Sequence, residues 1–296
     1  MTAFGAPLRS AFAALAFGGA AVLSCSPGEG QGAVKGELNV AACWSGPFDL
    51  KPDFFAGVPF RDRAADGTIR DAFQIRIQNG GDFQNFSDGL SILIDDVHAI
   101  RPEGAKPGLF GQALPVALAP SVTPPGVPIT PNASPAGVHV TLYLQRSCRT
   151  QTVALYAMDS VSLNADGSCK APPLDAAPLA ACQGSQGGAA PPAGDAGATV
   201  DAGPGLDAGA DASVTGATGA TAPVGRSSIT FTHLFNGNPI EADAAERRNA
   251  ATFRLYLADP REICPGGLGP PPRCRGFLEG SFDFYFERGR PAQPFP

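Results

Sequence analysis

Carboxylates are the first side chains in this sequence that could do acid–base chemistry. Asp283 and Glu287 lie in a run that alternates phenylalanine with polar residues, so both would point to one face of a strand. Four residues of strand separate them by about 13 Å, more than the roughly 5–9.5 Å between the two carboxyl groups of a glycosidase. Asp95 and Asp96 are adjacent and would point to opposite faces. We interpret all four as solvated strand residues.

Nucleophilic catalysis has equally little support. His98, His139 and His233 fall in separate apolar runs without a recognisable partner, and the sequence has no Gly-x-Ser-x-Gly elbow. The Pro/Gly loop around Gly266 and Gly267 opens no helix and is not expected to cradle phosphate. The sequence therefore favours a non-enzymatic protein without a cofactor. The alternative is a secreted hydrolase acting on polysaccharide, whose carboxylates would have to converge from different strands.

Two short segments resemble parts of oxygen-ligand loops for calcium. One is Asn164–Ser168, and the other places Asp62 near Asp66-Gly67. Neither supplies the later acidic ligand of an EF-hand. Side chains of Asn and Asp that cap their own turns explain both segments, and we predict no metal site.

The four tyrosines suggest a binding surface. Tyr143, Tyr156, Tyr256 and Tyr285 each lie out of phase with the apolar residues of their runs, so they would point outward. Tyr143 would share a face with His139 and Thr141, Tyr256 with Arg254, and Tyr285 with Asp283 and Glu287. If these strands are neighbours, Tyr143, Tyr256, Arg254 and Tyr285 would form an exposed platform for sugar rings or a protein partner. The alternative is that tyrosine simply favours solvated strand faces.

These candidate residues depend on strands that the hydrophobic pattern predicts. Apolar residues alternate with polar ones in runs bounded by Gly, Pro, Asn and Asp, which is typical of antiparallel sheets with one buried face. The runs are centred on Ile75, Ile92, Val140, Leu155, Phe231, Leu255 and Phe284. The one helical candidate is 241–249. We predict an all-β fold, an antiparallel β-sandwich of about eight strands.

Residues 183–224 differ from the rest. They are mostly Ala, Gly, Asp, Thr and Pro, with no aromatic or basic residue, and are expected to form a disordered insertion. Calcium-binding repeats would need a stricter spacing of Asp and Gly. We predict a tether over 25–34 and one sandwich domain over 35–296, interrupted by this insertion. Two small domains joined by a linker is the alternative, although the C-terminal one would have a marginal core.

Seven cysteines suggest an oxidising compartment. Six of them (Cys43, Cys148, Cys169, Cys182, Cys264 and Cys274) are candidates for disulfides, with fifteen possible pairings. The closest spacings favour Cys264 with Cys274 and Cys169 with Cys182, which leaves Cys43 with Cys148. Zinc is the weaker alternative because no pair has CxxC spacing.

The seventh cysteine, Cys25, directly follows a predicted leader over residues 1–24. One basic residue, Arg9, precedes an apolar stretch of about 13 residues, too short for the roughly 20 that span a bilayer. Val22-Leu23-Ser24-Cys25 resembles the lipobox of bacterial lipoproteins. The resemblance implies diacylglycerol on Cys25 and membrane attachment by lipid, and Ser26 implies the outer membrane. An ordinary secretory signal that happens to contain a cysteine is the alternative.

The charge composition argues against nucleic acid as a binding partner. The formal net charge is −6 with few lysines, so the chain lacks the basic surface that nucleic-acid binding requires. The sequence predicts a lipoprotein of the cell envelope, periplasmic or surface-exposed, that binds polysaccharide or an envelope protein.

Overall fold

Alternating apolar and polar residues form the strands of one large sheet. The computed structural model describes residues 30–40, 43–63, 67–80, 87–102, 107–123, 136–148, 153–169, 223–238, 240–264 and 270–286. Eleven strands of this part join in the sheet, and all their pairings are antiparallel. They are β1 (Gly30–Val40), β2 (Trp44–Leu50), β3 (Phe54–Arg63), β4 (Ile69–Gln78), β5 (Asp88–Ile94), β6 (Leu114–Pro115), β7 (Val138–Leu144), β8 (Val153–Ala157), β11 (Ser228–His233), β12 (Arg248–Ala258) and β13 (Gly276–Tyr285). The predicted all-β fold is confirmed.

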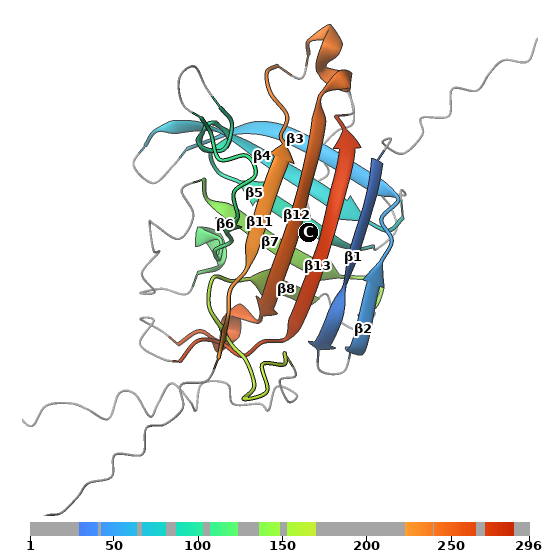
Figure 1. The fold of residues 1–296 in the computed structure, drawn as a ribbon, viewed down its shortest axis with the longest axis vertical. Coiled ribbons are helices and arrows are strands. Elements are labelled where there is room, and N and C mark those ends of the chain that lie inside the picture. Colours follow the sequence, from blue (N-terminus) through green and yellow to red (C-terminus); the bar gives the residue numbers. More distant parts are fainter. Residues whose placement is uncertain are drawn as a thin grey trace, which may run out of the picture.

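The sheet folds into two layers that face each other (Figure 1). The front layer contains β2, β1, β13, β12, β11 and β6, and the rear layer contains β3, β4, β5, β7 and β8. The strands of the two layers cross in projection (Figure 1). The layers are continuous where the end of β12 pairs with β8, through Leu257 opposite Ala157 and Ala258 opposite Tyr156.

The front layer mixes strands from both ends of the chain. N-terminal β1 pairs with C-terminal β13 over nine residue pairs, from Gly30 opposite Phe284 to Leu38 opposite Gly276. β13 in turn pairs with β12 along most of its length. The segments before and after the predicted insertion therefore build one sheet and share one core.

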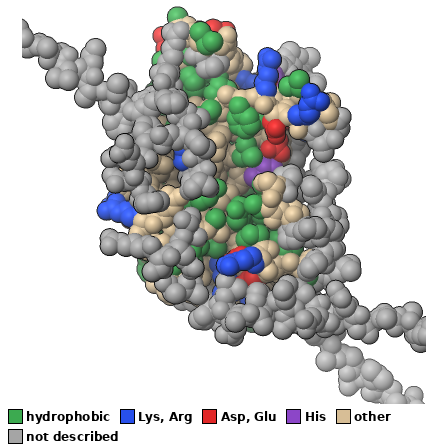
Figure 2. Space-filling view, turned by 180° about the vertical axis from the view of Figure 1, so that it is seen from behind, with side chains coloured by type: hydrophobic (Ala, Val, Ile, Leu, Met, Phe, Trp, Pro, Cys, Tyr) green, Lys and Arg blue, Asp and Glu red, His purple; other side chains and the backbone are tan. Residues whose placement is uncertain are grey.

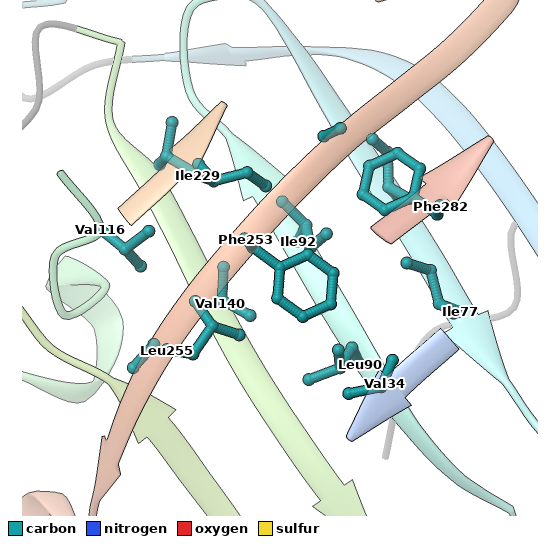
Figure 3. Packing of buried hydrophobic residues seen from close by; sticks show 14 of the residues in the cluster. Val34, Ile77, Leu90, Ile92, Val116, Val140, Ile229, Phe253, Leu255 and Phe282 are labelled. Atoms are coloured by element: carbon teal, nitrogen blue, oxygen red, sulfur yellow. The ribbon is translucent and has the colours of Figure 1, made fainter. Parts of the chain in front are cut away.

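Inward side chains of both layers form the main core (Figure 3). Phe253 and Leu255 of β12 meet Val140 of β7 and Ile92 of β5 between the layers (Figure 3). Each fully buried aliphatic or aromatic side chain contributes roughly 1.5–3 kcal/mol, so this cluster is the main source of stability. A second cluster of Met158, Val161, Ala258 and Cys274 lies apart from it.

Helical structure among the described residues is limited to four short 3-10 helices. They are η1 (Val97–Ala99), η2 (Pro120–Val122), η3 (Ala242–Glu246) and η4 (Pro260–Glu262). The predicted helix over 241–249 is therefore wrong beyond η3, because β12 begins at Arg248. Asn249 faces the core, and its side-chain oxygen accepts a hydrogen bond from the Phe235 amide at 2.9 Å, which favours the strand.

The predicted segment boundaries shift at two places. β1 begins at Gly30, so residues 30–34, expected in the tether, belong to the sheet. At the other end, Val224 lies in β10 (Val224–Gly225), which pairs with β9 (Val161–Ser162). Residues 183–222 of the predicted insertion lie outside the described residues.

Candidate functional site

The histidines contact carboxylates and backbone rather than a nucleophile. His98 Nε2 lies 2.9 Å from Asp71 Oδ2 at an exposed position, and this hydrogen bond lowers the pKa of Asp71. His139 is buried on β7, with Nδ1 2.9 Å from the Ala117 carbonyl oxygen and Nε2 3.0 Å from Asp95 Oδ2. The His139 ring thus connects β7 to the segment after β6 and to the end of β5, which is a structural role.

The buried acids hold loops in place. Asp88 accepts hydrogen bonds from the amides of Arg146 and Ser147 at 3.0 and 3.1 Å, which fixes the turn between β7 and β8. Asp259 Oδ1 accepts a hydrogen bond from Arg261 Nε at 3.0 Å. Glu262 pairs with Arg275, and both side chains are almost fully buried.

Asp283, a candidate for acid–base work, is held by an arginine of the neighbouring strand. Arg248 Nε donates to Asp283 Oδ1 at 2.6 Å, and Arg248 Nη2 pairs with Asp283 Oδ2. These hydrogen bonds lower the pKa of the Asp283 carboxyl and raise the pKa of Arg248. The carboxyl therefore stays ionised and does not act as a proton donor near neutral pH. Glu287 lies outside the described residues.

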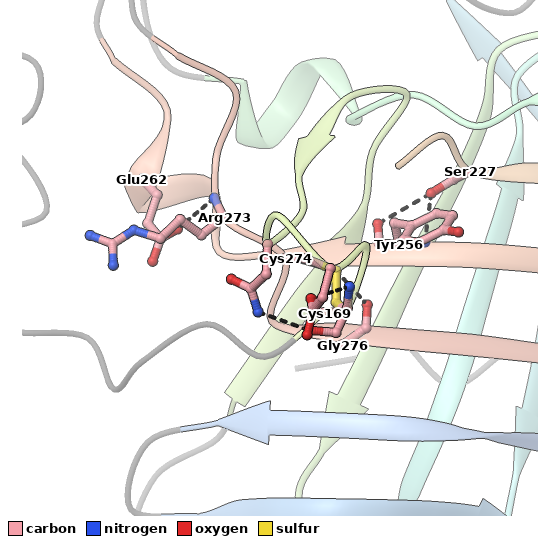
Figure 4. Close-up of a disulfide and its surroundings, with 10 residues drawn as sticks. Cys169, Ser227, Tyr256, Glu262, Arg273, Cys274 and Gly276 are labelled. Carbon is pink, nitrogen blue, oxygen red and sulfur yellow. Dashed lines mark hydrogen bonds between the residues drawn. A yellow bond between two sulfur atoms is a disulfide. The ribbon is translucent and has the colours of Figure 1, made fainter. Parts of the chain in front are cut away.

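The disulfides follow the fold rather than the spacing in the sequence (Figure 4). Cys43 pairs with Cys148, as expected, with their Cα atoms 5.1 Å apart. Cys169, however, pairs with Cys274, so the two expected local pairings are wrong. The reason is that β9 runs beside the segment just before β13, where the Cys274 amide donates to the Ser162 carbonyl oxygen at 3.0 Å. Cys264 is also disulfide-bonded; Cys182 and Cys25 lie outside the described residues.

The suspected calcium loop at 164–168 is a turn that its own side chains cap. The Ser168 amide donates to Asp166 Oδ1 at 2.9 Å, and Asn164 Nδ2 donates to Ser168 Oγ at 2.9 Å. Gly167 provides the positive φ of +77° that this turn requires. Among the described residues, no group of three or more His, Cys, Asp or Glu side chains is arranged to hold a metal ion.

The predicted tyrosine platform is divided between the layers. Tyr143 and Tyr156 lie on the outer side of the rear layer, where Thr141 and Tyr156 have adjacent positions in the β7–β8 register. Burial raises the pKa of both phenols. The nearby Tyr156 phenol raises the pKa of Tyr143 further, and the nearby Asp259 carboxylate does the same for Tyr156. Tyr143 therefore does not join Tyr256, Arg254 and Tyr285, which belong to β12 and β13 of the front layer.

The centre of the outer side of the rear layer is not exposed. There the outward polar residues Arg76, Ser91, His139 and Thr141 of β4, β5 and β7 are buried, whereas Phe60 and Asp62 near the end of β3 are exposed. Seen from behind, the described residues of this side show hydrophobic and neutral polar atoms, a histidine near an acidic side chain, and Lys or Arg side chains toward the edges (Figure 2). The centre of this side is therefore not an open platform.

The outer side of the front layer is open, and we call it the front face. It consists of the outward side chains of β2, β1, β13, β12 and β11, which is the side turned to the viewer in Figure 1. Thr252 and Arg254 of β12 and Glu279 and Ser281 of β13 are all exposed. Three of the four predicted platform residues, Arg254, Tyr256 and Tyr285, contribute to this face.

One end of the front face carries an aromatic pair that the sequence interpretation missed in part. Tyr256 of β12 lies opposite Phe277 of β13, with ring centroids 5.0 Å apart. The Arg254 guanidinium lies over the Phe277 ring, 5.4 Å from its centroid. The signal for Phe277 is its phase, because it is out of register with the inward Leu278, Phe282 and Phe284.

The other end carries Tyr285, which is 46% exposed and lies opposite Arg248 in the β12–β13 register. The Arg248–Asp283 pair lies beside it. Tyr256 and Tyr285 are eight residues apart along the paired strands, a distance of about 26 Å. They therefore do not form one compact aromatic cluster but mark the two ends of a long surface.

Two rows of side chains cross the front face between these ends. In the first, Asp49, Lys35, Glu279 and Arg254 occupy successive strands in register, so acidic and basic residues alternate. Arg254 and Glu279 form an ion pair at 3.9 Å. In the second, Ala33, Ser281, Thr252 and Thr230 are in register. This second row is small, uncharged and rich in hydroxyl groups.

Comparison with known proteins adds no relative: no family model, curated protein or solved structure matches this chain. None of the helices in the described part of the chain is both long and apolar enough to cross a membrane.

Proposed function

We propose that this protein is a lipoprotein of the bacterial cell envelope, attached to the outer membrane through Cys25, and that it binds a ligand without catalysis. The binding surface in this proposal is the front face. The ligand is a polysaccharide or a protein of the envelope or its surroundings.

The observation that carries the proposal is the open front face with its aromatic and charged side chains. Arg254, Phe277 and Tyr256 contact one another at one end, and Tyr285 lies beside Arg248 at the other. Ring faces and guanidinium groups held on rigid strands are typical of binding surfaces, because little side-chain entropy is lost when a ligand binds. The centre of the rear layer exposes less side-chain surface, since its outward polar residues Arg76, Ser91, His139 and Thr141 are buried.

A binding role also fits the state of the acidic groups. Asp88, Asp259 and Glu262 hold turns and an arginine, and Asp283 is ionised and paired with Arg248. A glycosidase needs one carboxylic acid with a raised pKa to protonate the leaving group. The pKa of Asp283 is instead lowered, which favours binding over hydrolysis.

Binding is tested with the oxidised mature chain, residues 26–296, against a panel of envelope polysaccharides and envelope protein extracts. We expect retention that falls at least tenfold, a loss of about 1.4 kcal/mol, in an Arg254→Ala, Tyr285→Ala variant. The matched control is Arg63→Ala, Phe60→Ala, whose residues are exposed on β3 of the rear layer. Equal retention by both variants would contradict a ligand site on the front face.

The anchor is tested separately in cells of a Gram-negative host. Wild-type chain should incorporate labelled fatty acid and fractionate with the outer membrane, whereas Cys25→Ala should remain unlabelled. Two or three acyl chains hold a protein essentially permanently, since each buried methylene contributes about 0.8 kcal/mol. A wild-type chain that is released into the periplasm without lipid would contradict the anchor.

A further inference from the structure

We infer that the ligand of the front face is an uncharged linear polysaccharide, and that it lies along β12 and β13 between Phe277 and Tyr285. This inference rests on the proposed function and names the ligand class and its direction on the same surface.

The charges on the front face argue against a polyanionic ligand. Each Lys or Arg of this face among the described residues has a carboxylate on an adjacent strand: Lys35 is in register with Asp49 and Glu279, and Arg248 is paired with Asp283. Glu279 also pairs with Arg254. Because positive charge is matched in this way, the face offers no net attraction to a polyanion.

The same paired groups suit hydroxyl groups. A guanidinium has five N–H donors and a carboxylate has about four acceptor positions, so a pair such as Arg248–Asp283 does not use all of them. Donors and acceptors therefore lie side by side, as neighbouring sugar hydroxyls require. Hydrogen bonds to charged groups contribute about 1.5–3 kcal/mol each.

The order of side chains along β12 and β13 indicates the direction in which the polysaccharide lies. Going along β12 and β13, the aromatic pair of Tyr256 and Phe277 comes first and the charged row second. Thr252 with Ser281, Ala250 with Asp283, and finally Arg248 with Tyr285 then follow. Thr252 and Ser281 have short side chains, so a chain of sugars can lie flat across them. The exposed Tyr285 ring can stack on a sugar at one end, whereas at the other end Tyr256 and Phe277 are half-buried, with Gly225 against the Tyr256 ring, and present only part of their rings. The separation of about 26 Å between these ends requires an extended polymer rather than a single sugar.

The ligand class is tested by affinity electrophoresis of the oxidised chain, residues 26–296, in gels that contain defined polymers. The uncharged probes are amylose, curdlan, dextran and hydroxyethylcellulose, and the acidic probes are alginate and dextran sulfate. We expect retardation by at least one uncharged polymer, little changed between low and high salt, and none by the acidic ones. Binding to acidic polymers alone, or binding that falls steeply with salt, would overturn the inference.

The direction is tested with Thr252→Trp, which places a large ring in the exposed middle of the proposed path. We expect this variant to bind the retarding polymer at least tenfold more weakly, equivalent to about 1.4 kcal/mol. Thr68→Trp is the matched control, because Thr68 is exposed beside β4 of the rear layer, and it should bind like wild type. Equal binding by both variants would overturn the proposed path.

The two proposals fail in different ways. A protein ligand that Arg254→Ala, Tyr285→Ala releases, without binding to any polymer, overturns the uncharged polysaccharide and keeps the front face as a binding site. Absence of any polymer or protein ligand overturns both. Circular dichroism and a cooperative thermal transition check that each variant is folded.

Discussion

Glu262 and Arg275 form an ion pair whose two side chains are only 7% and 3% exposed. Arg275 follows Cys274, so the pair lies next to the Cys169–Cys274 disulfide, and Glu262 Oε2 also accepts a hydrogen bond from the Arg273 amide at 3.1 Å. A buried ion pair contributes little net stability, but removal of one charge leaves the other poorly solvated. The pair therefore fixes how η4 meets the start of β13.

Glu262→Gln tests this residue-scale role. We expect the free energy of unfolding to fall by about 3–5 kcal/mol, because the Arg275 guanidinium loses its buried carboxylate. Urea unfolding monitored by circular dichroism measures the change. Glu279→Gln is the control, since its pair with Arg254 is exposed on both sides and surface pairs contribute roughly 0–1 kcal/mol. Similar losses in both variants would contradict the buried role.

Asp283 gives a prediction of pH dependence at the same scale. Its pKa is lowered in the folded chain by hydrogen bonds from Arg248, so the contribution of the pair is present above the ordinary pKa of 3.8. That contribution is lost as the pH falls through the lowered value. NMR titration of the carboxyl should give a midpoint below 3.8 in wild type and a higher midpoint in Arg248→Gln. An unchanged midpoint in the variant would rule out Arg248 as the cause.

At the scale of elements, the sequence missed β1, a strand in which glycine occupies inward positions. β1 carries Gly30, Gly32 and Gly36 among few apolar residues, so the alternation is weak. A Cβ atom on Gly32 would lie 3.0 Å from the Phe55 ring, which approaches from β3. Glycine is present because a ring of the rear layer fills its place, and only the tertiary structure contains that information.

Gly36 allows an even closer approach. A Cβ atom there would lie 1.8 Å from the Phe277 carbonyl oxygen of β13, which is backbone and cannot rotate away. Gly36→Ala should therefore force β1 and β13 apart and lower the free energy of unfolding by about 1–3 kcal/mol, as overpacking does. Lys35→Ala on the same strand, with its side chain exposed, should change it little. Chemical unfolding of the two variants decides, and equal stability would contradict the close contact.

For the candidate site as well, the sequence predicted local features and missed those that depend on strand pairing. Phase along β12 and β13 placed Arg254, Tyr256 and Tyr285 outward, because period-two alternation is a local property. Phase could not reveal that Tyr143 belongs to the other layer, nor that Arg248 pairs with Asp283, since strand order depends on long-range pairing. The Cys169–Cys274 disulfide was missed because the prediction favoured the shortest spacings between cysteines, whereas these two cysteines meet only through the fold.

At the scale of the whole molecule, the described residues on either side of 170–222 are held close together. β9 pairs with β10 across the segment between them, and the Leu163 amide donates to the Pro223 carbonyl oxygen at 2.9 Å. The Cys169–Cys274 disulfide joins the residues that follow β9 to the start of β13. The two points that flank the segment are thus held by contacts of the sandwich itself.

Replacement of residues 183–222 by a short Gly/Ser linker should therefore leave the sandwich intact. We expect unchanged far-ultraviolet circular dichroism, cooperative unfolding, and a free energy of unfolding that is equal or higher by about 1 kcal/mol, because a shorter loop costs less closure entropy. Binding to the front face should also persist, since β12 and β13 belong to the described sheet. A shortened chain that is folded but no longer binds would instead make the excised residues part of the ligand site.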